Sequence, residues 1–232
     1  MKKFLVVLCL ILMAFSAFAE EDLNLDAVQK GVENGDPEAI NALGVVYYEG
    51  LNGVKQDYAK AIELFTKAAD AGNATALTNL ARMYYLGMGV KKDTKKAAEY
   101  FTKAAEKGDT EATYGLALMY DNGEGGFKKD KKKAAELYRK AAEEGFRDAQ
   151  SNLAGMYYIG DGIPQDKEQA FFWYKKAAEQ GEAKSQYNIA IMYGKGEGVK
   201  QDDALAREWM KKAADQGYED AVTEMKKLDE SK

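Results

Sequence analysis

The stretch AQSNLAGMYYIGDGIPQDKEQAFFWYKKAAEQG, residues 149–181, contains the pattern that decides the fold. Its first part places Ala149, Leu153 and Tyr157 four residues apart, which is the spacing of one face of an α-helix. A loop with paired glycines, Gly160 and Gly162, follows, and a second Ala-rich amphipathic segment closes on another glycine. The stretch therefore predicts two helices joined by a tight loop.

The same pattern recurs along most of the chain. The closing glycine returns every 36 or 37 residues, at Gly35, Gly72, Gly108, Gly145, Gly181 and Gly217. A single helix pair cannot bury its apolar face, so a fixed period of this length is typical of an all-α solenoid. The sequence predicts five helix pairs in residues 36–217, with boundaries at 36–72, 73–108, 109–145, 146–181 and 182–217.

Helix start signals support this division. Asp36 precedes Pro37, which combines an N-cap with the proline that the first helical turn tolerates. The second segment of each repeat follows an aspartate that we interpret as its N-cap, at Asp57, Asp93, Asp130, Asp166 and Asp202. Its core stripe is small–aromatic–small, as in Ala61, Phe65 and Ala68.

The two ends of the chain differ from the repeats. Residues 1–19 combine Lys2 and Lys3, an apolar run and the small-residue site Ala17-Phe18-Ala19, a pattern typical of a secretory signal peptide. Residues 20–35 are predicted to form a capping helix, and residues 218–232 a second capping helix with a charged tail. The sequence therefore predicts an exported protein, periplasmic or secreted, that is a monomer.

Composition excludes several kinds of chemistry. The chain has no His, which removes Ser-His-Asp and Cys-His catalysis and every His-ligated metal site. Its single Cys lies in the apolar run of the signal peptide, so the exported form is expected to have no disulfide. Loss of two lysines with residues 1–19 would take the formal net charge from −5 to −7, which disfavours nucleic acid as a partner. No cofactor, no metal and no membrane insertion after cleavage are expected.

A known family shares this pattern. The sequence A-x-x-x-L-[GA]-x-x-Y-x-x-G, then G-V-x-x-D, then A-x-x-[WYFL]-[FYM]-x-K-A-A-x-x-G, resembles the Sel-1-like repeat, a relative of the tetratricopeptide repeat. The resemblance covers residues 36–217. It implies an α/α superhelix that acts as an adaptor or scaffold for protein complexes. A disulfide-rich secreted branch of the family is linked to β-lactam binding or hydrolysis, but its cysteines are missing here, so that activity does not carry over.

Candidate binding residues lie on the first helix of each repeat, on the face opposite its core stripe. If the leading Ala, or Ser185 in the last repeat, is position zero, positions +2, +6 and +9 point together. Each repeat has one tyrosine at +2 or +9. We predict an inner groove that binds a partner peptide or helix through Tyr48, Tyr85, Tyr114, Tyr158, Tyr187, Arg82, Leu118 and Ile191.

Several alternatives stand beside this prediction. The tyrosines can instead pack between adjacent first helices. Trp173 and Trp209 occupy a core slot, and the lysine clusters at 91–96 and 128–133 are either solvated or attract an anionic partner. The acidic glycine loops do not match the spacing of a calcium loop. We therefore predict a noncatalytic protein-binding scaffold of the envelope, with an envelope enzyme or glycan-binding protein acting on cell-wall fragments as the alternative function.

Overall fold

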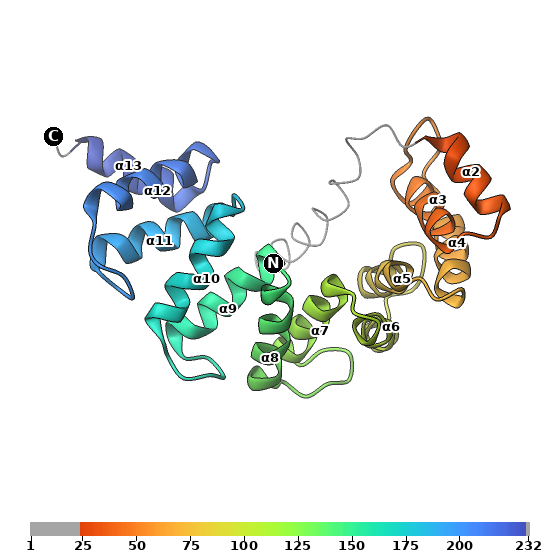
Figure 1. The fold of residues 1–232 in the computed structure, drawn as a ribbon, viewed down its shortest axis with the longest axis horizontal. Helices are drawn as coiled ribbons and strands as arrows, with labels where there is room; N and C mark the ends of the chain where they lie inside the picture. The colour runs from red at the N-terminus through yellow and green to blue at the C-terminus, as the bar shows by residue number, and fades with distance from the viewer. Residues whose placement is uncertain (1–23, 231–232) are drawn as a thin grey trace. The chain divides into compact units, whose positions relative to one another are not determined.

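The computed structural model describes residues 24–230, so the predicted signal peptide lies outside the described residues. Within that range every regular element is a helix and none is a strand (Figure 1). None of the described helices is long and apolar enough to cross a membrane. The helices are α2 Leu25–Glu33, α3 Pro37–Glu49, α4 Tyr58–Asp70, α5 Ala74–Leu86, α6 Thr94–Glu106, α7 Thr110–Asn122, α8 Lys131–Glu143, α9 Arg147–Ile159, α10 Lys167–Glu179, α11 Ala183–Lys195, α12 Asp203–Asp215 and α13 Glu219–Glu230.

Helices α3 to α12 form the five predicted pairs, which confirms the all-α class. We call α3, α5, α7, α9 and α11 the first helices and α4, α6, α8, α10 and α12 the second helices. The aspartates interpreted as N-caps of the second helices act as such, since each side chain accepts a backbone N–H of the first turn. Asp36 caps α3 in the same way, and Pro37 occupies its first turn.

One backbone contact closes each pair. The N–H of the capping aspartate donates to the carbonyl of the tyrosine at position +8 of the preceding first helix, as Asp57 does to Tyr47 at 2.8 Å and Asp166 to Tyr157 at 2.9 Å. The first helix ends on a glycine in the left-handed conformation, Gly50 or Gly160 in these repeats. The Gly and Asp of each repeat thus fix the loop between its helices.

The chain divides into two compact units, and the boundary lies between Ala112 and Thr113 within α7. In the first unit consecutive helices from α2 to α6 pack on one another, and in the second unit consecutive helices from α8 to α13 do the same (Figure 1). Each unit has a core built from both helix types. Phe65 is the largest fully buried side chain of the first core, and Tyr138 is the largest of the second.

Small residues let neighbouring helices approach closely. A Cβ at Gly44 of α3 would lie 2.6 Å from a ring carbon of Phe65 on α4, so the glycine makes room for the ring. Gly31 of α2 packs on Ala39 of α3, where a Cβ atom at position 31 would lie 2.5 Å from the Cβ of Ala39. The Ala and Gly positions of the repeat therefore set how near its helices come.

The second glycine of the loop joins one repeat to the next. Gly162 lies against the backbone of Lys131 at the start of the preceding second helix. A Cβ atom at position 162 would lie 2.6 Å from the carbonyl carbon of Lys131. Gly198 lies in the same way against the backbone of Lys167 and Glu168. Both glycines also have positive φ, +76° and +68°. Glycine is needed at both positions for two reasons: the turn has a positive φ, and the stacking of repeats leaves no room for a side chain.

Candidate functional site

A pocket of about 600 Å³ lies along the first helices of the first unit, and we call it the first-unit pocket. Small-molecule sites commonly occupy roughly 300–1,000 Å³. Its walls come from α2, α3, α5 and the first turn of α7. The aliphatic part of the wall consists of Ala27, Val28, Ala39, Ala42, Val45 and Leu51. The pocket is therefore a concave and largely apolar surface.

Two polar pairs interrupt this apolar wall. Asn79 of α5 donates its side-chain N–H to the side-chain oxygen of Asn41 of α3, at 2.9 Å. Arg82, one turn further along α5 and only 4% exposed, pairs with Glu111 of α7 at 3.1 Å. The two pairs join neighbouring first helices and place an amide pair and an ion pair in the same pocket.

Burial acts against the charged forms of both members of the ion pair. It raises the pKa of Glu111 above its ordinary value, although the charge of Arg82 pulls the pKa in the opposite direction. It also lowers the pKa of Arg82, against the attraction of Glu111. A pair whose desolvation exceeds its mutual attraction adds little to stability. Groups of this kind gather at binding and catalytic sites more often than elsewhere.

A smaller concavity of about 210 Å³ lies in the second unit, and we call it the tyrosine pocket. It brings together three residues of the predicted binding set, Tyr158 from α9 and Tyr187 and Ile191 from α11. Tyr174 of α10 also lines it; this side chain is 7% exposed, and its burial raises the pKa of its hydroxyl. Asn188, Met192 and Lys195 complete the lining.

Tyrosines at position +9 reach the glycine loop of the next repeat. The hydroxyl of Tyr158 donates to Glu197 at 2.6 Å, and Glu197 also pairs with Lys167 at 2.8 Å. In the first unit the hydroxyl of Tyr48 lies 3.0 Å from the sulfur of Met88, which occupies the equivalent loop position. The hydroxyl end of these two rings thus contacts the loop of the next repeat and links the two repeats.

The contact between Tyr158 and Glu197 predicts a pH dependence of stability. The hydrogen bond from Lys167, and to a smaller extent the one from Tyr158, holds the pKa of Glu197 below its ordinary value. A lowered folded-state pKa stabilises the fold above the unfolded pKa of about 4.3, and this stabilisation disappears as pH falls through the folded pKa. We expect Glu197→Gln to be less stable than the native protein at pH 7, and the difference to shrink below about pH 4.3. Urea denaturation across this range measures it; a difference that does not change with pH would contradict the assignment.

Tyrosines at position +2 divide between core and surface. Tyr114 is 5% exposed and packs against Tyr138 and Phe146, with ring centroids 5.8 and 4.9 Å apart. Tyr187 is half-buried and stacks at a tilt on Tyr218, at 5.3 Å. Tyr48, at +9, is 4% exposed and belongs to the first core. Tyr48 and Tyr114 belong to the predicted binding set, but their burial leaves them little surface that a partner could contact.

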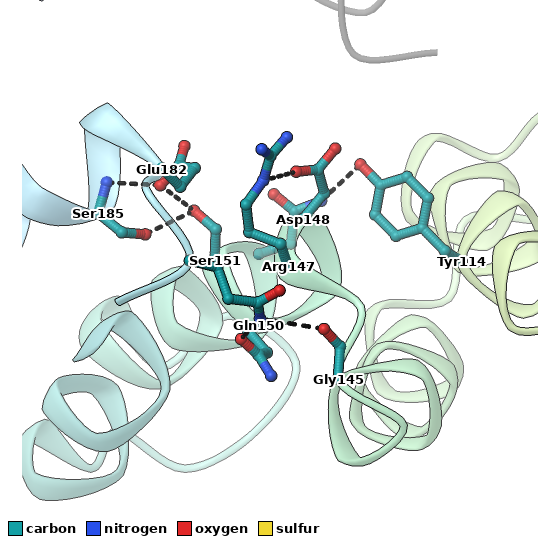
Figure 2. A network of polar contacts seen from close by, with 10 residues as sticks. Tyr114, Gly145, Arg147, Asp148, Gln150, Ser151, Glu182 and Ser185 are labelled. Atoms are coloured by element: carbon teal, nitrogen blue, oxygen red, sulfur yellow. Dashed lines mark hydrogen bonds and ion pairs between the residues drawn. The ribbon is translucent and has the colours of Figure 1, made fainter. Parts of the chain in front are cut away.

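The start of α9 holds a network of polar side chains that join three repeats of the second unit (Figure 2). Glu182, the N-cap of α11, accepts hydrogen bonds from the Ser185 backbone and from the hydroxyl of Ser151 at 3.3 Å. Ser185 and Ser151 are themselves 3.2 Å apart. Gln150 accepts from the side chain of Gln180 at 2.8 Å. These groups satisfy one another, so the network holds the first helices together.

Two further polar contacts lie beside this network. Arg147 donates to the adjacent carboxylate of Asp148 at 3.0 Å, and Asp148 is 8% exposed. The side-chain amide of Asn152 donates to the hydroxyl of Tyr114 at 3.4 Å, which anchors the buried ring. Tyr114 and its hydrogen-bond partner Asn152 both belong to the second unit.

One lysine pairs with carboxylates from two of the acidic glycine loops of the second unit. Lys131, at the start of α8, pairs with Asp121 at 2.5 Å and with Asp161 of the next repeat at 2.7 Å. In the described part of the chain no group of three or more acidic, His or Cys side chains could hold a metal ion. Asp121 and Asp161 therefore join neighbouring repeats through Lys131.

The other predicted residues occupy intermediate positions. Tyr85 and Leu118 are half-buried; Lys92 lies 5.1 Å from the ring centroid of Tyr85, and Leu118 packs against the second core. Trp173 and Trp209 also pack against that core, as expected from their sequence slot. Of the predicted set, Tyr158, Tyr187 and Ile191 share the tyrosine pocket, whereas Arg82 lines the first-unit pocket.

Sequence reasoning missed two positions of the first helix. Position −1 supplies Glu38, Glu111 and Asp148, and position +3 supplies Asn79, Asn152 and Asn188. Aligning the repeats shows both signals, because acids recur at −1 in three repeats and Asn at +3 in three repeats. Neither pattern predicts which residue of the adjacent repeat each side chain contacts. The contact between Arg82 and Glu111, for example, spans 29 residues.

Solved structures of similar proteins share this fold. A protective antigen of uropathogenic Escherichia coli with an SLR fold is 34% identical, with a TM-score of 0.76 over 85% of this chain and 42% of that chain. A Sel1 repeat protein from Oxalobacter formigenes is 33% identical, with a TM-score of 0.73 over 81% of this chain and 74% of that chain. An immunity protein from Pseudomonas aeruginosa is 26% identical, with a TM-score of 0.54 over 81% of this chain and 67% of that chain.

A curated relative matches a shorter stretch. The ERAD-associated E3 ubiquitin-protein ligase component HRD3A from Arabidopsis thaliana is 33% identical over 70 residues, which is 30% of this chain and 10% of the relative. The chain thus spans a tenth of that relative and less than half of the Escherichia coli antigen.

The family model described as Sel1 repeat matches the chain five times, at residues 37–73, 74–109, 110–146, 147–182 and 183–218. These matches cover most of the chain and coincide with the five helix pairs. Proteins built from Sel1 repeats generally mediate protein–protein interactions, and their fold is typically a noncatalytic interaction scaffold. The chain belongs to the Sel1 repeat family.

Proposed function

We propose that this chain is a noncatalytic protein-binding scaffold, and that its tyrosine pocket holds an anchor side chain from a segment of a protein partner. The observation that carries the proposal is the meeting of Tyr158, Tyr187 and Ile191 at one concavity of the first helices. In the repeat pattern all three lie on the face of the first helix opposite its core stripe. A volume of about 210 Å³ suits an inserted side chain better than a whole small ligand.

The chemistry of the pocket supports an apolar or aromatic anchor. Tyrosine rings provide a large contact area at little cost in side-chain entropy, and they are enriched at protein interfaces. Ile191 adds an aliphatic surface, while Asn188 and Lys195 supply polar groups at the same site. An extended peptide or a helix can present such an anchor. A polar lining around apolar contact area is the usual composition of a protein interface.

The proposed location is outside the cytoplasm, in the cell envelope or secreted. The sequence of residues 1–19 supports this proposal through its basic start, apolar run and Ala17-Phe18-Ala19 site. Bacterial relatives described as a protective antigen and as an immunity protein are compatible with it. We also propose a monomer, because the exposed charged side chains Lys226 and Lys227 of α13 disfavour stacking of a further copy on that helix.

A matched pair of substitutions tests the binding surface. Ile191→Lys places a charge in the tyrosine pocket, while Ile159→Lys makes the same change at a side chain that is 67% exposed at the end of α9. We expect the native protein and Ile159→Lys to capture the same protein in a crosslinking pull-down from envelope extract, and Ile191→Lys to lose it. Circular dichroism establishes that both variants are folded. Undiminished capture by folded Ile191→Lys would place the binding surface elsewhere.

A further inference from the structure

We propose that the first-unit pocket binds a second stretch of polypeptide, one in which a lysine or arginine lies between small aliphatic side chains. The basic group would contact Glu111 and Glu38, and the aliphatic side chains would pack on Val28 and Val45. This inference rests on the proposed protein-binding function and adds the chemistry of the ligand. It concerns a different pocket, so the two proposals can fail separately.

The charges that line the first-unit pocket favour a cation. The ionisable side chains of its lining are Asp36, Glu38, Glu111 and Arg82, three acids against one base. The single base is already paired, since Arg82 donates to Glu111 at 3.1 Å. Asp36 and Glu38 are both exposed at the start of α3, where an incoming cation can reach them. The pocket therefore has an excess of negative charge next to an aliphatic wall.

Glu111 is the carboxylate best placed to hold the cation. It lies within the pocket lining, and its Oε1 atom accepts the hydrogen bond from Arg82. A carboxylate has two oxygens and can accept from two cationic donors at once. Burial already raises the pKa of Glu111, so a second cation would favour its ionised form. A hydrogen bond between charged groups in a partly desolvated site is among the stronger polar contacts in proteins.

The amide pair suits the main chain of such a peptide. An asparagine side chain carries a donor and an acceptor, like a peptide bond. Asn41 is half-buried, lines the pocket, and is held by Asn79 at 2.9 Å. This contact limits the rotation of Asn41 before the ligand arrives, which lowers the entropic cost of binding. The aliphatic wall beside it, with Ala27, Ala39 and Ala42, offers apolar contact to the aliphatic side chains that flank the cation.

Capped pentapeptides test the chemistry directly. The probe is Ala-Val-Lys-Val-Ala, with acetyl and amide ends; the two comparison peptides carry norleucine or glutamate in place of lysine. Binding to the full chain is followed by NMR through the side-chain amides of Asn41 and Asn79. We expect the lysine peptide to shift these amides and to bind about tenfold more tightly than the norleucine peptide, with the advantage falling at high salt.

Variants of this chain assign the effect to its residues. Glu111→Gln should reduce the affinity for the lysine peptide to that for the norleucine peptide and leave the latter unchanged. Glu99→Gln removes the same charge from the exposed surface of α6 and should change neither affinity. If Glu111→Gln does not fold, Glu38→Gln serves instead, since Glu38 is exposed, and should weaken the lysine peptide about threefold.

Three results would overturn the inference. Equal affinity for the lysine and norleucine peptides would show that the cation is not recognised. Tightest binding of the glutamate peptide would show that Arg82 receives an anion instead. Absence of shifts at Asn41 and Asn79 with millimolar lysine peptide would exclude the pocket as a peptide site. None of these results would affect capture of a protein through the tyrosine pocket.

Discussion

Gly198→Ala is expected to destabilise the second unit by about 2–5 kcal/mol, because the new methyl group meets two separate obstacles. Gly198 has φ of +68°, a conformation that costs an L-residue roughly 1–2 kcal/mol. Its Cβ would also collide with the backbone of Lys167 and Glu168 at the start of α10, which is not free to move as a side-chain tip would be. Overpacking of this kind typically costs another 1–3 kcal/mol, as an order of magnitude.

Gly181→Ala is the matched control for this substitution. Gly181 has φ of +86°, but a Cβ there would meet no atom within 4 Å. It should therefore cost only the conformational part, roughly 1–2 kcal/mol. Urea denaturation followed by circular dichroism compares the two variants with the native chain. Equal losses of stability would contradict a stacking role for the second loop glycine.

Phe65→Ala is expected to cost the first unit about 3–5 kcal/mol, the range for removing a fully buried aromatic ring. The Phe65 side chain has no exposed surface and fills the space above Gly44, so its loss leaves a cavity that the helix pair cannot close without moving. Phe172→Ala makes the same change at a ring that is 47% exposed on α10, and should change stability by less than about 0.5 kcal/mol.

The same denaturation experiment separates these expectations. A loss for Phe65→Ala that is no larger than that for Phe172→Ala would mean that the first core is not organised around Phe65. Because Phe65 belongs to the first unit, a separate transition of that unit, if one is seen, should be the one that shifts. The second-unit transition then serves as an internal reference.

The helices, their caps and their loops could be predicted from the sequence because each depends on residues close together in the chain. Asp57 caps α4 through a contact three residues long, and Gly50 ends α3 through its own φ. Five repetitions of these local signals removed the ambiguity of any single one. The closing contact between Asp57 and Tyr47 also spans only ten residues.

The binding surface was harder to predict, because the helical wheel gives the face of one helix and not the position of its neighbours. Tyr48 and Tyr85 share position +9, yet Tyr48 is 4% exposed and Tyr85 is half-buried. Tyr114 faces the predicted direction but is covered by Phe146, which belongs to the following repeat. The Arg82–Glu111 pair depends on how neighbouring first helices stack, and no pattern within one repeat encodes it.

Site-specific photocrosslinking tests protein binding by the first helices most directly. A photoreactive benzoylphenylalanine is placed at position 191, in the tyrosine pocket on α11, or at position 172, at the exposed ring of the second helix α10. Irradiation in envelope extract, followed by mass spectrometry of the adducts, identifies what each position touches. Partner binding by the first helices predicts a protein adduct at position 191 that is absent at position 172. A protein adduct at position 172 with none at position 191 would contradict it.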